Sequence, residues 1–119
     1  MYNRKIPRKY NCALEVTMDV LGGKWKSYII CYLRKGVKRP SELQKLIPDA
    51  NRRVLNQQLK ELEEHDIVAK TIYPVMPPKV EYYLTPFGEE LGGVVDAMES
   101  WGRCYRDRFE DKSTPPEVV

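Results

Sequence analysis

Residues 51–84, NRRVLNQQLKELEEHDIVAKTIYPVMPPKVEYYL, contain the pattern that decides the fold. Apolar residues in the first part recur at helical spacing, which predicts an amphipathic helix from about Arg52 to His65. Two runs of strand-forming residues follow, Ile67–Tyr73 and Val80–Leu84, and a proline-rich tip separates them. The stretch therefore predicts a helix that leads directly into a two-stranded hairpin.

The predicted helix has an apolar side and a basic, amide-rich side. Val54, Leu55, Leu59 and Leu62 fall on the first side, and Arg53, Asn56, Gln57 and Lys60 fall on the second. Arginine can bond guanine, asparagine and glutamine can pair with adenine, and lysine can neutralise phosphate. This face favours a helix that reads base edges in the DNA major groove through Arg53, Asn56 and Gln57. The alternative is an ordinary solvated helix face without a partner.

A second, shorter helix is expected just before the reading helix. Ser41 has the character of an N-cap, and Gln44 three residues later completes a capping-box pattern. The helix of about Glu42–Ile47 then ends before Pro48, and Asn51 is the next plausible cap. Two helices joined by a turn of about three or four residues form a helix-turn-helix.

The flanking positions predict contacts to the DNA backbone. Ser41, Arg52 and Lys60 are expected to contact or flank phosphates. Asn51, the cap of the reading helix, is also expected to belong to the DNA-binding residues. The hairpin corresponds to the wing of a winged helix. Lys79 lies beside its tip, where it is expected to contact phosphate or enter the minor groove.

The remaining segments predict helices at both ends of the domain. A short helix is expected over residues 12–21, a bend at Gly22-Gly23, and a helix over about 24–35. Thr85-Pro86 has the pattern of an N-cap followed by N1, which opens a helix to about Phe109 with a long apolar stripe. Dimerisation would cover that stripe. The fold class is α+β, mainly α, with residues 12–110 as the domain, 1–11 as a flexible basic arm and 111–119 as a disordered tail.

Composition narrows the function further. The 119 residues suffice for one domain, and no apolar run approaches the roughly 20 residues of a membrane span, so a cytoplasmic protein is expected. Three widely spaced cysteines and one histidine indicate no disulfide framework, no metal site and no cofactor. No catalytic motif is present, so an enzyme is not expected. Basic charge is concentrated where the reading helix lies, because residues 22–60 carry +8 and residues 61–119 carry −7. This asymmetry suits a polyanionic partner.

At this point the sequence resembles a known family, the HxlR-type regulators, a bacterial branch of the MarR-like winged-helix proteins. The resemblance rests on Cys12, on DVLGGKWK at 19–26, on LNQQLKELE at 55–63, and on Tyr73-Pro74, PPKVEY at 77–82, Leu84-Thr85 and Gly88. It implies a homodimer that binds operator DNA, with the N- and C-terminal helices at the interface. The chain departs from the family at Pro40, where members often have an aromatic residue, and at Asn51, where many have serine.

Two questions stay open at the level of sequence. In some relatives the cysteine at the position of Cys12 senses oxidants or electrophiles, and the basic arm and a helix N-terminus would lower its pKa here. The other interpretation, which we prefer, is that Cys12 serves only as a small apolar residue at the dimer interface. Whether the protein responds to a small-molecule or redox effector stays open. The alternative to DNA binding is a winged-helix protein-interaction module, whose free helix face would be acidic or apolar.

Overall fold

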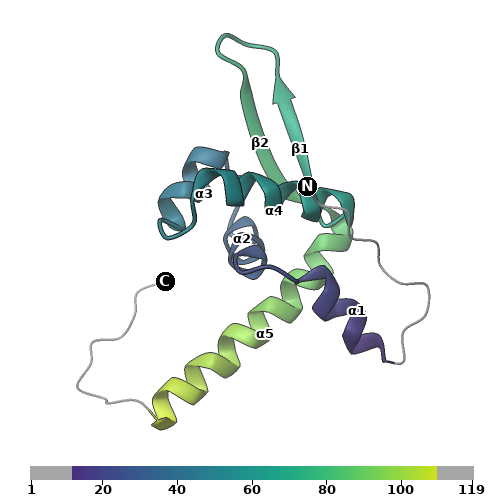
Figure 1. Ribbon diagram of the computed structural model, residues 1–119, viewed down its shortest axis with the longest axis vertical. Coiled ribbons are helices and arrows are strands. Elements are labelled where there is room, and N and C mark those ends of the chain that lie inside the picture. The colour runs from purple at the N-terminus through teal and green to yellow at the C-terminus, as the bar shows by residue number, and fades with distance from the viewer. Residues whose placement is uncertain (1–11, 110–119) are drawn as a thin grey trace.

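A computed structural model describes residues 12–109 and consists of five helices and one hairpin (Figure 1). The helices are α1 (Ala13–Val20), α2 (Lys26–Leu33), α3 (Pro40–Leu46), α4 (Arg52–Glu64) and α5 (Pro86–Phe109). The strands are β1 (Val68–Tyr73) and β2 (Lys79–Leu84), which pair antiparallel with Val68 opposite Leu84 and Tyr73 opposite Lys79. The expected arm at 1–11 and tail at 111–119 lie outside the described residues.

The hydrophobic core lies where α2, α3 and α4 pack together under the foot of the hairpin. Ile29, Ile30, Leu43, Leu59 and Leu62 are fully buried there. The hairpin contributes Val68 and Leu84 from the paired ends of its strands, so only its foot is anchored in the core. Its outer part projects away from the helices (Figure 1).

The start of α3 differs from the sequence expectation. Ser41 is not the N-cap, because Pro40 already occupies the first helical position and Arg39 precedes it as the N-cap. Proline suits the first turn since its fixed φ matches the helix and its missing N–H would have no helical partner. Glu42 completes the turn by accepting a 2.7 Å hydrogen bond from the Arg39 backbone N–H.

The end of α4 is a Schellman motif built on an aspartate. Asp66 has a φ of 61°, a left-handed conformation that is uncommon for residues other than glycine and asparagine. The Ile67 N–H donates to Leu62 O at 3.0 Å, and the Asp66 N–H donates to Glu63 O at 3.0 Å. These two bonds satisfy the last carbonyls of α4 and turn the chain into β1.

The start of α5 follows the expectation and lies against the end of α4. Thr85 is the N-cap, since its Oγ1 accepts from the Gly88 N–H at 2.9 Å while donating to Asp66 O at 2.6 Å. Gly88 packs directly on the carbonyl of Ile67, where no Cβ would fit. The C-terminus of α4, the start of β1 and the start of α5 therefore meet at one place.

Most of α5 leaves the body of the protein. Its buried residues are Gly88, Gly92 and Val95, all in the first half, and none of the described residues after Val95 is buried. The second half extends away from the other helices (Figure 1). Among the described residues, no helix is long and apolar enough to cross a membrane.

Candidate DNA-binding surface

The turn between α3 and α4 is held by two side chains. Asn51 caps α4 as predicted, with its Oδ1 accepting from the Val54 N–H at 2.9 Å. Gln44 does not act in a capping box. Its amide instead donates to the carbonyl of Ala50 at 2.5 Å, and at 3.4 Å to that of Ile47. The Gln44 side chain of α3 thus stabilises the turn that sets the direction of α4.

The predicted reading face of α4 is open at most of its positions. Three of its four side chains, Arg53, Asn56 and Lys60, are exposed, while the leucines of the opposite side are buried in the core. Arg52, which was predicted to flank phosphate, is exposed as well. Asn56 and Lys60 also line a hollow of mixed charge between α4 and the hairpin, whose other lining residues are Glu63, Glu64, Lys70 and Tyr82.

Gln57 differs from these residues, because it is half-buried and already has a partner. Its amide donates to Glu61 Oε2 at 3.1 Å, one helical turn further along α4. The other carboxylate oxygen, Oε1, lies 2.6 Å from Lys26 Nζ, whose side chain is only 1% exposed. Gln57 is therefore the end of a polar chain that begins inside the protein, a feature that helical periodicity alone does not reveal.

The Lys26–Glu61 ion pair ties α2 to α4. Burial alone would raise the pKa of Glu61, but the hydrogen bonds from Lys26 and Gln57 and the charges of Lys26 and His65 outweigh it. The pKa of Glu61 therefore lies below its ordinary value of 4.5. A second link lies beside the first, where the Trp25 N–H donates to Gln58 Oε1 at 2.9 Å.

The wing is anchored at its foot and carries Lys79 near its tip. Backbone bonds in both directions between Lys38 and Tyr82, of 3.1 and 2.8 Å, hold β2 against the segment before α3. Lys79 Nζ lies 4.6 Å from the centre of the Tyr73 ring and 3.8 Å from Glu81 Oε2. Tyr73 also donates to Glu81 at 3.1 Å, and the pKa of this tyrosine is raised by that bond and by the charge of Glu81.

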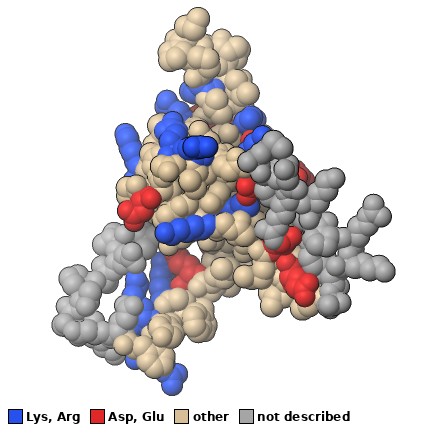
Figure 2. Space-filling model, viewed as in Figure 1, with Lys and Arg blue, Asp and Glu red and all other residues tan. Residues whose placement is uncertain are grey.

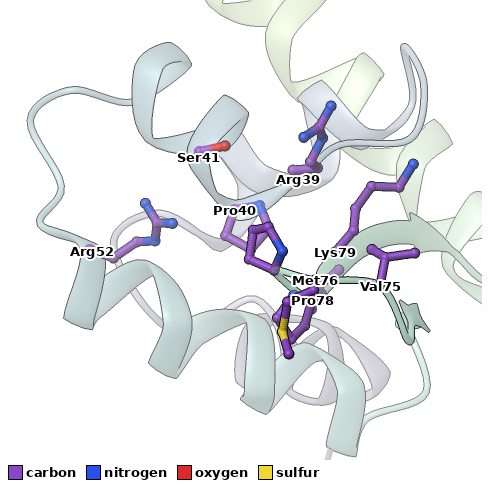
Figure 3. A pocket seen from close by; sticks show the side chains of 10 residues that line it. Arg39, Pro40, Ser41, Arg52, Val75, Met76, Pro78 and Lys79 are labelled. Atoms are coloured by element: carbon purple, nitrogen blue, oxygen red, sulfur yellow. The ribbon is translucent and has the colours of Figure 1, made fainter.

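A hollow of about 510 Å³ separates the wing tip from the N-termini of α3 and α4 (Figure 3). Its lining residues come from three elements and their loops: Arg39, Pro40, Ser41, Arg52 and residues 75–80. Ser41, Arg52 and Lys79, all predicted to meet the DNA backbone, are thereby brought together. Arg39 was missed, although it stands directly before a proline at the start of a helix.

The wider surface agrees with this concentration of positive charge. On the face shown in Figure 2, lysine and arginine side chains gather below the tip of the hairpin, with a few acidic side chains among and below them, and the tip itself shows no charge. A phosphate backbone carries one negative charge per nucleotide, so a basic surface around a projecting hairpin suits it.

The three cysteines lie apart from this surface. Cys12 is exposed and occupies the N-cap position of α1, and Cys104 is exposed on α5. Cys31 of α2 lies 4.0 Å from Glu99 Oε2, and burial together with the negative charge of Glu99 raises the pKa of its thiol. Within residues 12–109, no group of three or more His, Cys, Asp or Glu side chains is arranged to hold a metal ion.

A helix-turn-helix whose second helix is basic and amide-bearing, followed by a wing, is typical of transcriptional regulators of the winged helix-turn-helix class. The HxlR-like helix-turn-helix family model matches residues 20–110, and the chain belongs to this family. The HTH-type transcriptional regulator YtcD of Bacillus subtilis is 44% identical over 107 residues, which span 86% of this chain and 85% of YtcD.

Solved structures of similar proteins include the redox regulator HypR and the transcriptional regulator YodB. The reduced form of HypR superposes with a TM-score of 0.79 at 42% identity, covering 83% of this chain and 98% of that one. Diamide-treated YodB of B. subtilis gives a TM-score of 0.65 at 35% identity, over 83% of this chain and 94% of that one. The fold class and family inferred from the sequence are thus confirmed.

Proposed function

We propose that this regulator binds operator DNA as a homodimer, with α4 in the major groove and the wing beside it. The observation that carries the proposal is the exposed set Arg52, Arg53, Asn56 and Lys60 on α4, next to the cationic hollow under the wing. A protein-interaction module would instead present an acidic or apolar face there. Arg53 and Asn56 reach base edges, and Gln57 joins them from its position beside Glu61.

The remaining residues position the protein on the duplex. Ser41, Arg52 and Lys60 contact or flank phosphates, and Lys79 contacts phosphate or the minor groove from the wing. Asn51 fixes the first turn of α4, whose N–H groups and positive dipole end also favour an anion.

The dimer is supported by an uncovered apolar stripe. Large apolar side chains on α5 are exposed in the protomer, several of them aromatic and in contact with one another: Phe87, Val94, Met98, Trp101, Tyr105 and Phe109. Leu14 and Met18 of α1 are exposed as well. Patches of this extent mark protein interfaces. A two-fold dimer would place the two copies of α4 about 34 Å apart, one turn of DNA.

The test begins with selection of bound fragments from genomic DNA, followed by titration of the selected operator. We expect Arg53→Ala to cost about 1–3 kcal/mol per half-site and to relax preference at one position. Lys79→Ala should weaken binding to all DNA sequences alike. It should also reduce the slope of log affinity against log salt concentration by about one for each phosphate that is no longer neutralised. Lys35→Ala removes the same charge from the turn after α2 and serves as the control.

Two results would contradict the proposal. One is operator affinity and base preference that stay unchanged when Arg53 and Gln57 are both replaced by alanine. That result would favour the protein-interaction module. The other is a monomer in sedimentation at micromolar concentration.

Cys12 gives this proposal a second, redox-dependent form. Its exposed thiol lies at the start of α1, beside Leu14 and Met18 of the proposed interface. Oxidation or alkylation there would place new bulk or a crosslink at the interface and rotate the two reading helices out of register. Operator affinity before and after oxidant should then change in the parent and not in Cys12→Ser. An identical response of both proteins would exclude Cys12 as the sensor.

A further inference from the structure

The tip of the wing is unusual for a surface that faces a polyanion, because it is apolar. Residues 74–78 read PVMPP and contain no charge. Met76 is 95% exposed and Val75 is 55% exposed, at the end of the hairpin farthest from the helices (Figure 1). Three prolines restrict the backbone of this segment, so it can present its apolar side chains without losing much conformational freedom on binding.

Positive charge lies directly beneath the apolar tip. Arg39, Arg52 and Lys79 line the hollow below Met76 and Pro78, and no carboxylate lines it (Figure 3). Two acids lie next to these cations: Glu42, which accepts a 2.7 Å hydrogen bond from the Arg39 backbone N–H, and Glu81, 3.8 Å from Lys79. The wing tip is apolar and cationic side chains lie below it. It therefore suits a partner whose groove or interior is apolar and whose outer edge carries negative charge.

The DNA minor groove has that character. Its floor and walls are base edges and sugars, while phosphates line both rims, and its width of about 6 Å admits a single extended segment. Side chains such as methionine, proline and leucine enter minor grooves elsewhere as wedges between base steps. An anionic lipid surface is the other amphipathic polyanion. It fits less well, because the apolar area here is confined to one narrow loop.

The position of Arg52 in the fold favours DNA over a lipid surface as the partner of the tip. It is the first residue of α4 and at the same time lines the hollow under the tip. A duplex that occupies the face of α4 therefore passes the mouth of this hollow, and its flanking minor groove meets the tip.

We propose that Val75 and Met76 enter the minor groove beside the bases read by α4, and that Met76 wedges into one base step. Arg39, Arg52 and Lys79 hold the phosphates on the two sides of that step. This inference rests on the proposed function and adds to it a bend in the DNA. It also predicts a preference for flexible TA or CA steps at the flank, where unstacking costs least.

The test uses the full-length protein and the selected operator, with 2-aminopurine placed at successive flanking steps and fluorophores at the duplex ends. Binding of the parent should raise 2-aminopurine fluorescence at one step per half-site and shorten the end-to-end distance. Met76→Ser should abolish both signals and weaken binding about 5- to 10-fold, while the footprint of α4 stays. Met76→Leu should retain both signals because it keeps the apolar wedge.

Ile72→Ser is the matched control, since Ile72 is 60% exposed on β1 of the same hairpin, paired with Val80 and outside the tip segment 74–78. It should leave both signals unchanged. Arg39→Gln should lower the salt slope by about one without changing the fluorescent step.

The wedge is refuted if Met76→Ser bends and unstacks the operator as the parent does. Binding of the parent to phosphatidylglycerol vesicles that requires Met76, with operator binding independent of it, would assign the tip to membranes and also overturn the inference. In both cases Arg53-dependent operator binding would persist. Loss of operator binding by the parent itself would instead mean that the proposed function has failed.

Discussion

Replacing Glu61 by glutamine should destabilise the protein more than replacing Lys26 by methionine. The Lys26 side chain is 1% exposed, whereas that of Glu61 is 16% exposed. Glu61→Gln removes the Glu61 carboxylate from an ammonium group that stays buried, but Lys26→Met leaves a carboxylate that water can reach in part. At 2.6 Å and an effective dielectric constant of about 20, the attraction is about 6 kcal/mol before desolvation is subtracted.

Desolvation of the lysine removes much of that attraction, so we expect Glu61→Gln to cost about 3–5 kcal/mol. Lys26→Met should cost about 1–2 kcal/mol, because the methionine fills most of the same volume. The double variant should lie close to Lys26→Met, which makes the coupling energy about 3–5 kcal/mol in magnitude, the same as the cost of Glu61→Gln alone.

The assay is urea denaturation of the four proteins, all at one protomer concentration because dimerisation would shift the midpoint. With a slope of about 1.5 kcal/mol per molar, a loss of about 3 kcal/mol moves the midpoint by about 2 M. Additive effects of the two single substitutions would refute the argument.

The pH dependence provides a second check on the same pair. Since the pKa of Glu61 is lowered in the folded protein, its contribution is complete above 4.5 and is lost as the pH falls through the folded pKa. The difference in stability between parent and Glu61→Gln should therefore shrink below pH 4.5.

Four further outcomes are expected. Asp66→Gly should raise stability by up to about 1 kcal/mol in thermal unfolding, since glycine adopts the φ of 61° without cost and removes a negative charge from a helix C-terminus; a loss would argue against the left-handed conformation. Gly88→Ala should destabilise strongly because its Cβ would meet Ile67 O, whereas Gly93→Ala, with open space around it, should be neutral or stabilising by about 0.5–1 kcal/mol. Asn51→Ala should cost about 1 kcal/mol and Asn51→Ser little, as judged by the urea midpoint. In a variant that keeps Cys31 but has serine at positions 12 and 104, the alkylation rate should have its pH midpoint above 9.0, and a midpoint below that value would contradict the raised pKa.

Much of the fold could be predicted because local signals and the tertiary structure agree. The leucine spacing of α4, the asparagine before it and Thr85-Pro86 at the start of α5 each have a single plausible local solution. Ser41 was misassigned because two N-cap patterns overlap, and the choice depends on Pro40 being the first helical residue rather than the last loop residue.

The site could be predicted only as far as helical periodicity reaches. Periodicity places Gln57 on the same face as Asn56, but it cannot show that a lysine 31 positions earlier in the chain is buried against Glu61 and so provides Gln57 with a partner. Arg39 was missed for the same reason, since the hollow that it shares with the wing tip depends on how the hairpin is placed relative to the start of α3.

The contact between Gly88 and the Ile67 carbonyl joins the wing and α5 rigidly at one place. On one side of the joint the wing begins at Val68, and on the other α5 begins at Pro86, with the Thr85 hydroxyl bonded to Asp66 across the gap. Because backbone lies on backbone there, little side-chain rearrangement is available to absorb a rotation of α5. A change in the angle of α5 would therefore swing the wing and the end of α4 by the same angle, and the displacement would grow with distance along the hairpin to its largest value at Met76.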